Sequence, residues 1–269
     1  MRGTSRESLA AARERLEPVL AAPDAAALGD QLFAVAGLLD SSLALRRALT
    51  DPARDGRARA ELATRLLRGQ VSETAGDVVA GLVRARWAEP RDLPDAVEQL
   101  GTEAVLASAE RARQLEQVED ELFRFSRVVV GDRALLAALD DRSASADQRG
   151  ALVERLLGGK VAPPTLTLVR QVVAAPRGRR VEEALEDLLQ AAAARRKRLV
   201  AVVTAAVPLT EGQRQRLTAA LGRVYGRQVL LEVDVDPEVV GGLSVQVGGE
   251  VLDATIAGRL AQARRRVAS

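Results

Sequence analysis

The sequence predicts a mainly α-helical protein with a small α+β C-terminal domain, in which a duplicated helical bundle is joined by a long helix. Apolar residues recur at helical spacing from residue 5 to about residue 198, and at every second residue from Leu199 onward. Part of the helical region also recurs further along the chain. We therefore expect an N-terminal helical bundle at 1–105, a second helical module at 106–198 and an α+β domain at 199–269.

The first bundle begins with an amphipathic helix. Its apolar stripe includes Leu9, Leu16 and Leu20, and Pro23 and Asp24 follow as a break and a cap. Further segments with helical spacing follow, separated by turn residues: 28–39, 43–49, 55–67 and 78–83. Short connections of this kind are typical of helical bundles.

A long apolar stripe then runs from Leu93 to Val129 in alternating steps of four and three residues. We expect one long helix or two abutting helices. A continuous helix would reach about 55 Å at about 1.5 Å per residue. Gly131 would end it, and Gly101 is the expected place for a bend. Such a helix would form a rod between two helical modules.

An internal repeat supports the second module. Residues 49–71 align with residues 139–161 without a gap, and nine of the 23 positions are identical. Both stretches contain a short helix, an acidic turn and a helix that ends in Leu-Leu-x-Gly. The second copy continues into a helix that starts at Pro163 and Pro164 and another that starts at Val181. We infer a duplicated helical module.

The C-terminal segment reads as strand, helix, strand, hairpin and helix. Thr210 and Gln213 have the spacing of a capping box at the start of the first helix. The hairpin turns at Gly248 and Gly249, and Asp253 is expected to cap the last helix. The expected strands are 199–205, 229–235, 243–247 and 250–252.

Composition excludes most catalytic chemistry. The chain has no cysteine and no histidine, which removes disulfides, Cys/His metal sites, thiol nucleophiles and imidazole acid–base catalysis. The carboxylates of the helix after Val181 lie among arginines and indicate a solvated face. We expect no catalytic, cofactor-binding or metal-binding residues. No run of about 18 apolar residues is present, so we also expect no direct membrane insertion.

Two basic clusters leave an alternative function open. Residues 195–198 and 264–266 are nearly all arginine, and each lies at the end of an expected helix, where cations complement the helix dipole and stay solvated. No aromatic side chains accompany them for base stacking. The net charge is only +2. The alternative is a basic helical adaptor that binds nucleic acid or an anionic surface.

The C-terminal segment resembles a known family. Residues 235–260 combine an Asp-Pro turn, a Gly-Gly pair, a hairpin and an aspartate that caps a helix containing Gly-Arg-Leu. The residues that carry the likeness are Asp236, Pro237, Gly241, Gly242, Asp253 and Arg259. The stretch is similar to the signature of the ATP synthase delta subunit, called OSCP in mitochondria. Because the helical module occurs twice, the chain resembles the long actinobacterial form of this family.

The resemblance implies a non-catalytic stator role in the peripheral stalk of a proton-translocating ATP synthase, on the cytoplasmic side of the cell membrane. In this family the helical domain holds the N-terminal helices of the alpha subunits, and the C-terminal domain holds the ends of the b subunits. No nucleic acid is implied. The family's groove lies between the first and fifth helices. We place it in the first copy, while the second also stays a candidate. The implied groove residues are Leu9, Leu16, Leu20, Val79, Leu82 and Val83.

Overall fold

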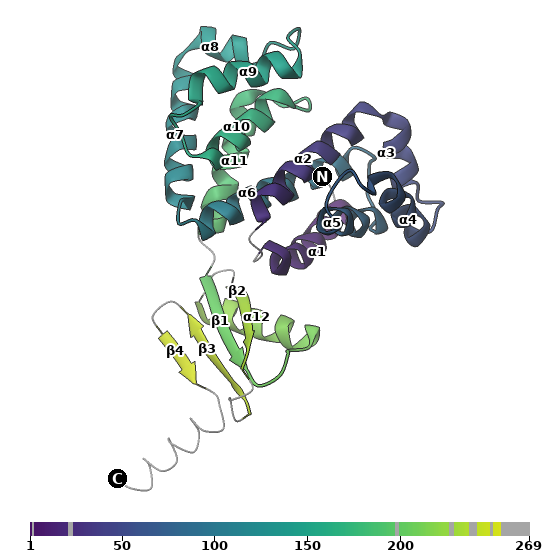
Figure 1. Cartoon of the computed structure of the whole chain (residues 1–269), viewed down its shortest axis with the longest axis vertical. Helices are drawn as coiled ribbons and strands as arrows, with labels where there is room; N and C mark the ends of the chain where they lie inside the picture. Colours follow the sequence, from purple (N-terminus) through teal and green to yellow (C-terminus); the bar gives the residue numbers. More distant parts are fainter. Residues whose placement is uncertain are drawn as a thin grey trace, which may run out of the picture. The chain divides into compact units, whose positions relative to one another are not determined.

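A computed structural model describes residues 1, 3–20, 24–196, 199–225, 229–236, 241–247 and 250–253. The chain forms two compact units, Met1–Arg196 and Lys197–Ser269, which are taken in turn (Figure 1). The described part of unit 1 is entirely helical, and that of unit 2 contains a sheet and one helix. This confirms the prediction of a mainly helical protein with a small α+β C-terminal part.

Unit 1 consists of eleven helices in its described residues. They are α1 (Gly3–Leu20), α2 (Ala25–Ser41), α3 (Leu43–Thr50), α4 (Gly56–Leu67), α5 (Glu73–Arg84), α6 (Asp92–Arg111), α7 (Leu115–Gly131), α8 (Arg133–Leu139), α9 (Ala146–Leu157), α10 (Pro163–Ala174) and α11 (Val181–Arg196). Side-chain caps fix several of the starts. Ser42 and Ser72 accept hydrogen bonds from the first turns of α3 and α5, and Ser145 forms a capping box with Gln148 at α9.

The expected rod of about 55 Å is absent, because the long apolar stripe is divided between α6 and α7. α6 ends at Arg111, and Arg113 takes a left-handed conformation with φ of 57° before α7 begins. The amide of Gln114 donates to the carbonyl of Ala109 at 2.8 Å and closes this turn. The second of the two expected arrangements, separate helices, is therefore correct.

Gly101 does not interrupt its helix. It lies inside α6, where a Cβ atom would stand 2.7 Å from the ring of Phe33 in α2. Gly29 of α2 is equally restricted, since its Cβ would stand 2.6 Å from Cγ2 of Val105. The two glycines allow α2 and α6 to pack closely, so close packing is the structural reason for a glycine at position 101.

Two hydrophobic cores lie within unit 1, and α6 contributes to both. Leu93, Val97 and Leu100 belong to a cluster with α1 to α5. Leu106 and Ala109 belong to a second cluster with α7 to α11. The expected boundary between residues 105 and 106 falls inside this shared helix.

The helix positions recur along unit 1. α2, α3, α4 and α5 begin at residues 25, 43, 56 and 73, while α7, α8, α9 and α10 begin at residues 115, 133, 146 and 163, each 90 residues later. α1 and α6 begin at residues 3 and 92, which are 89 residues apart. We call α1–α5 the first half and α7–α11 the second half of unit 1, with α6 shared between them. A glycine with positive φ follows α4 in the first half (Gly69) and α9 in the second (Gly159).

Unit 2 contains a four-stranded sheet in the order β2-β1-β3-β4. Its strands are β1 (Leu199–Ala205), β2 (Val229–Val235), β3 (Leu243–Val247) and β4 (Glu250–Asp253), and α12 (Glu211–Tyr225) connects the parallel pair β1 and β2. β3 runs antiparallel to β1 and to β4. Ala201, Val203 and Leu221 form the centre of its small core. The expected strands and the capping box at Thr210 are confirmed.

Candidate interaction sites

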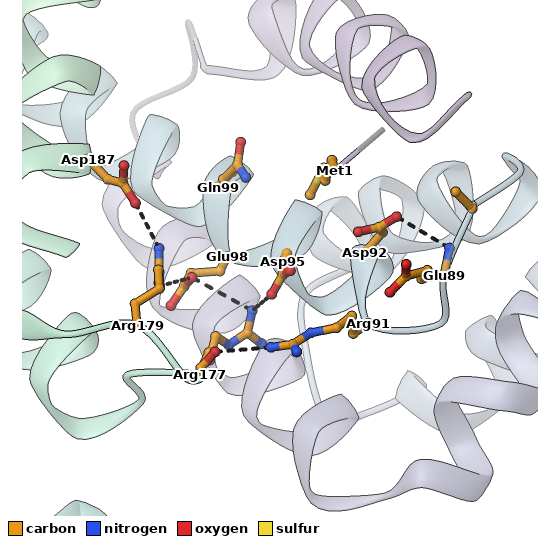
Figure 2. Close-up of a pocket in the computed structure, with 11 residues that line it drawn as sticks. Met1, Glu89, Arg91, Asp92, Asp95, Glu98, Gln99, Arg177, Arg179 and Asp187 are labelled. Atoms are coloured by element: carbon orange, nitrogen blue, oxygen red, sulfur yellow. Dashed lines mark hydrogen bonds and ion pairs between the residues drawn. The ribbon is translucent and has the colours of Figure 1, made fainter. Parts of the chain in front are cut away.

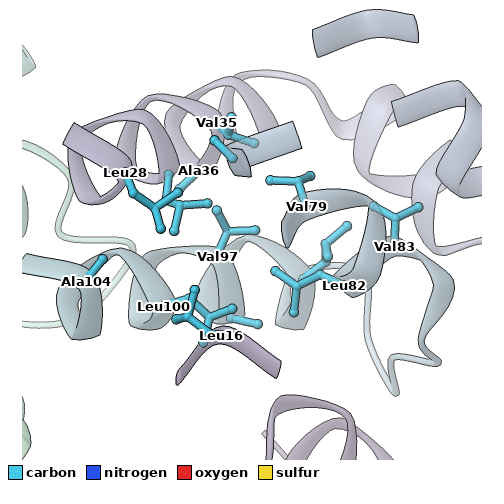
Figure 3. Packing of buried hydrophobic residues seen from close by; sticks show 14 of the residues in the cluster. Leu16, Leu28, Val35, Ala36, Val79, Leu82, Val83, Val97, Leu100 and Ala104 are labelled. Atoms are coloured by element: carbon cyan, nitrogen blue, oxygen red, sulfur yellow. The ribbon is translucent and has the colours of Figure 1, made fainter. Parts of the chain in front are cut away.

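The six residues expected to line a groove come together, but in the interior of the first bundle. Every one belongs to a single hydrophobic cluster and is at most 5% exposed. Figure 3 shows Leu16 against Leu100 of α6, and Val79, Leu82 and Val83 along α5. These side chains form the wall where α1, α5 and α6 meet. The set consists of Leu9, Leu16, Leu20, Val79, Leu82 and Val83.

Polar contacts hold α1 in this position. The Ser5 hydroxyl donates to Asp92 at 2.7 Å and accepts from the amide of Ala88 at 2.8 Å. Ser8 donates to the carbonyl of Arg86 at 2.7 Å, just beyond α5. These bonds hold the first turns of α1 against the start of α6 and the residues that follow α5.

The accessible apolar part of the seam between α1 and α5 is its rim. Ala12 and Val19 of α1 and Val78 of α5 are half-buried and pack against the same cluster. A helix that approached the seam from outside would meet these side chains first.

A buried arginine joins the two halves of unit 1 (Figure 2). Arg177 lies in the loop between α10 and α11 with φ of 54°, and its side chain is 5% exposed. Its guanidinium contacts Asp40 at 2.6 Å, Asp95 at 3.2 Å and Glu98 at 3.7 Å. It also donates to the carbonyl of Ala36 at 3.3 Å. A loop of the second half is thus bound to α2 and α6.

Neighbouring charges complete this joint. Arg179 contacts Glu98 at 2.6 Å and Asp187 at 3.4 Å. Burial raises the pKa of Asp95 above its ordinary value, although Arg177, Arg91 and Arg179 act in the opposite direction. These residues surround a cavity of about 350 Å³ in which the charges already face one another (Figure 2). This cluster of paired charges is a structural joint between the two halves.

Arg195 corrects one expectation from the sequence. It was expected to belong to a solvated basic cluster, yet it is 5% exposed and contacts Glu17 of α1 at 3.2 Å and Glu110 of α6 at 2.7 Å. Arg196 contacts Glu119 at 2.9 Å. Sequence reasoning missed this role because both partners of Arg195 are distant in the chain, and no local pattern marks them.

The C-terminal signature is described in part. The amide of Asp236 donates to the carbonyl of Ala205 at 3.0 Å, just after β2. Gly241 and Gly242 have φ of 64° and 84°, a conformation that favours glycine, immediately before β3. Asp253 ends β4. Pro237, Arg259, the turn at Gly248 and Gly249, the helix expected after Asp253 and the cluster at 264–266 lie outside the described residues.

The part of the chain that the structure describes holds no cluster of three or more His, Cys, Asp or Glu residues that could bind a metal ion. No helix among those residues is long and apolar enough to cross a membrane. A helical seam with an apolar rim and a separate α+β unit are features of proteins that dock on other polypeptides.

Comparison with known proteins shows the family to which the chain belongs. Residues 97–267 match the family model described as ATP synthase delta (OSCP) subunit. The chain is 52% identical to the ATP synthase subunit delta of Streptomyces griseus over 100% of both chains. It is 54% identical to that of Streptomyces avermitilis, over 99% of this chain and 98% of the relative, and 51% identical to that of Thermobifida fusca, over 100% of both. The chain belongs to the family of ATP synthase delta (OSCP) subunits, which are non-catalytic components of the peripheral stalk of F-type ATP synthases.

Proposed function

We propose that unit 1 holds the N-terminal helices of the alpha subunits and that unit 2 holds the C-terminal ends of the b subunits, on the cytoplasmic side of the cell membrane. The observation that carries this proposal is the likeness to delta subunits over the full length of the chain. A stalk subunit must hold two partners at once, and the chain offers two separate units.

The binding site for an alpha-subunit helix is the seam between α1 and α5 in the first half. Leu9, Leu16 and Leu20 of α1 form one side of its buried wall, and Val79, Leu82 and Val83 of α5 form the other. Ala12 and Val78 offer the partner helix an apolar rim. Helix-in-groove recognition requires such apolar positions on both walls.

The first half is favoured over the second because α2 lies beside the corresponding seam of the second half. There the corresponding helices are α6 and α10, and α2 contacts both of them. Phe33 packs over Gly101 of α6, and Asp30 of α2 faces Arg170 of α10. At α1 and α5 the helix that contacts both is α6, which belongs to the same core, as α11 does at α6 and α10.

We also propose that unit 1 arose by duplication of one helical module, with modules at 1–105 and 106–198 that share α6. The 90-residue recurrence of helix starts supports this. So do Arg59 and Arg149, which lie 90 residues apart and both donate to carbonyls at the end of the following helix, α5 or α10. The added module lengthens the reach of the stalk over the catalytic head.

The test is calorimetric titration of the full chain with a synthetic peptide of the alpha subunit's N-terminal helix, at two salt concentrations. The double variant Ala12→Asp, Val78→Asp places charge on the rim, and Val128→Asp on the exposed face of α7 is the control. Leu16 and Leu82 are unsuitable because an aspartate at either fully buried site would unfold the bundle.

We expect binding that changes little with salt, is weakened about tenfold or more by the double variant, and is unchanged in the control. Weakening by Val128→Asp alone would place the partner on α7 instead. A steep loss of binding with salt would favour the alternative of a basic adaptor for nucleic acid or an anionic surface. The pairing of Arg195 and Arg196 with carboxylates leaves less free positive charge for that alternative.

A further inference from the structure

An arginine-lined cavity lies beside the first turn of α4, away from the joint at Arg177. Its volume is about 530 Å³. Five arginines and one aspartate line it, together with the loop before α4. The arginines are Arg54, Arg57, Arg59, Arg84 and Arg86. Such an excess of positive charge within one concave surface attracts anions.

Arg59 lies at the base of this cavity and is incompletely bonded. Its side chain is 3% exposed, and one terminal nitrogen donates to the carbonyls of Arg84 at 3.3 Å and Ala85 at 3.2 Å. Its Nε atom is buried without a hydrogen-bond partner. No carboxylate among the described residues lies within ion-pair distance of it, in contrast to Arg177 and Arg195, which each contact two or more. An unpaired buried cation is costly.

Arg149 provides an internal comparison, since it occupies the same place 90 residues later. Its Nε donates to Val173 at 2.9 Å and its Nη2 to Ala174 at 2.8 Å. Its Nη1 donates to the carbonyls of Asp141 and Ala144 in the loop before α9. The loop of the first half makes no such bonds to Arg59, and the arginine-lined cavity lies beside this loop.

The surrounding arginines are also specific to the first half. Arg54, Arg57, Arg84 and Arg86 correspond, at the same shift of 90 residues, to Ala144, Asp147, Ala174 and Pro176. The half in which Arg149 has acceptors for all three nitrogens therefore lacks the other arginines. The half in which the Nε of Arg59 is buried without an acceptor has four more arginines around it. A general preference for basic surface residues would place arginines in both halves, so it does not explain why they occur only around Arg59.

The donors of the cavity are available. Arg84 and Arg86 form no ion pair with the described residues. Arg54 contacts Asp51 at 3.5 Å and Arg57 contacts Glu61 at 3.2 Å, but both pairs are exposed and therefore weak. Asp55 already accepts from the amide of Arg57 at the start of α4. The binding groups are thus the guanidinium side chains and not the helix terminus.

We propose that this cavity binds a phosphate group, either free or carried by a nucleotide. Planar guanidinium groups donate two parallel hydrogen bonds to phosphate oxygens, and a doubly charged phosphate offers enough acceptors for several of them at once. Arg84 and Arg86 bind its outer oxygens, and Arg59 stabilises the bound charge from below. The proposed phosphate site uses the guanidinium groups at the end of α5 and not the apolar rim at Ala12 and Val78 that is proposed for the alpha subunits.

The test is calorimetric titration of the full chain, at near-physiological salt, with inorganic phosphate, pyrophosphate and ADP in separate arms. The variant Arg84→Ala, Arg86→Ala removes two exposed donors, and circular dichroism checks that it is folded. The control Arg142→Ala, Arg155→Ala removes the same charge from exposed positions of the second half.

We expect saturable binding of one pyrophosphate per chain, weakened about tenfold or more by the cavity variant and less than about twofold by the control. Equal weakening in both variants, or no saturable binding in any arm, would overturn the proposal. A fourth titration uses an oligoglutamate peptide. If the chain binds this peptide but none of the three phosphate compounds, the proposal is also overturned. Tighter binding of ADP than of pyrophosphate assigns the site to nucleotides, and the reverse assigns it to free phosphates.

Discussion

Two glycine residues determine how closely α2 approaches α6. A Cβ atom on Gly101 would stand 2.7 Å from the ring of Phe33. We expect Gly101→Ala to lower the free energy of unfolding by about 1–3 kcal/mol, because the strain of overpacking exceeds the helix propensity of alanine. Urea denaturation, monitored by circular dichroism, measures this change in the free energy of unfolding.

Gly37 provides the matched control, because it lies in α2 with no atom within 4 Å of its Cβ position. Gly37→Ala should be neutral or stabilise the protein by up to about 1 kcal/mol. Equal stability of the two variants would contradict the packing argument.

Individual residues also show what could not be predicted from the sequence. An apolar stripe identifies Leu16 and Leu82 as buried positions, but a core and a partner groove have the same stripe, so the accessible rim at Val78 had to come from the structure. The burial of Arg177 depends on Asp40 and Asp95, which are distant in the chain. No local pattern encodes such a contact.

Among the elements, the loop between α10 and α11 determines how the two halves of unit 1 are joined. We expect Arg177→Met to lower the free energy of unfolding by about 3–5 kcal/mol, since it leaves Asp40, Asp95 and Glu98 without this cation. Hydrogen exchange should become faster in α2 and α10.

Arg180→Ala is the control. Arg180 is exposed and pairs with the neighbouring glutamates, so we expect its free energy of unfolding to change by no more than about 0.5 kcal/mol. A similar loss in both variants would show that general charge, and not the joint, matters.

Most elements could be predicted from the sequence, because their caps and apolar spacing are local. The strands of unit 2 and the helices before residue 85 are at the expected places. The break between α6 and α7 could not be located, since the apolar stripe continues in phase across it. The turn there is made by Arg113, a residue type that seldom takes positive φ, and no glycine or proline marks it.

For the whole molecule, the shared helix α6 predicts that unit 1 folds as one body. Leu106 and Ala109 are buried in the second core, and Phe33 of α2 lies there too. A fragment that ends at residue 111 would expose these side chains to water, whereas a fragment of residues 1–196 keeps them covered.

We therefore expect the shorter fragment to bind a hydrophobic dye and to self-associate, as proteins with exposed apolar patches do. The longer fragment should stay monomeric and unfold in a single transition at the same temperature as unit 1 of the full chain. Calorimetry measures the unfolding transition of both fragments, and sedimentation measures their oligomeric state. A short fragment that remained monomeric, bound no dye and unfolded cooperatively would show that the first module does not depend on the second, and that α6 is only a connection between them.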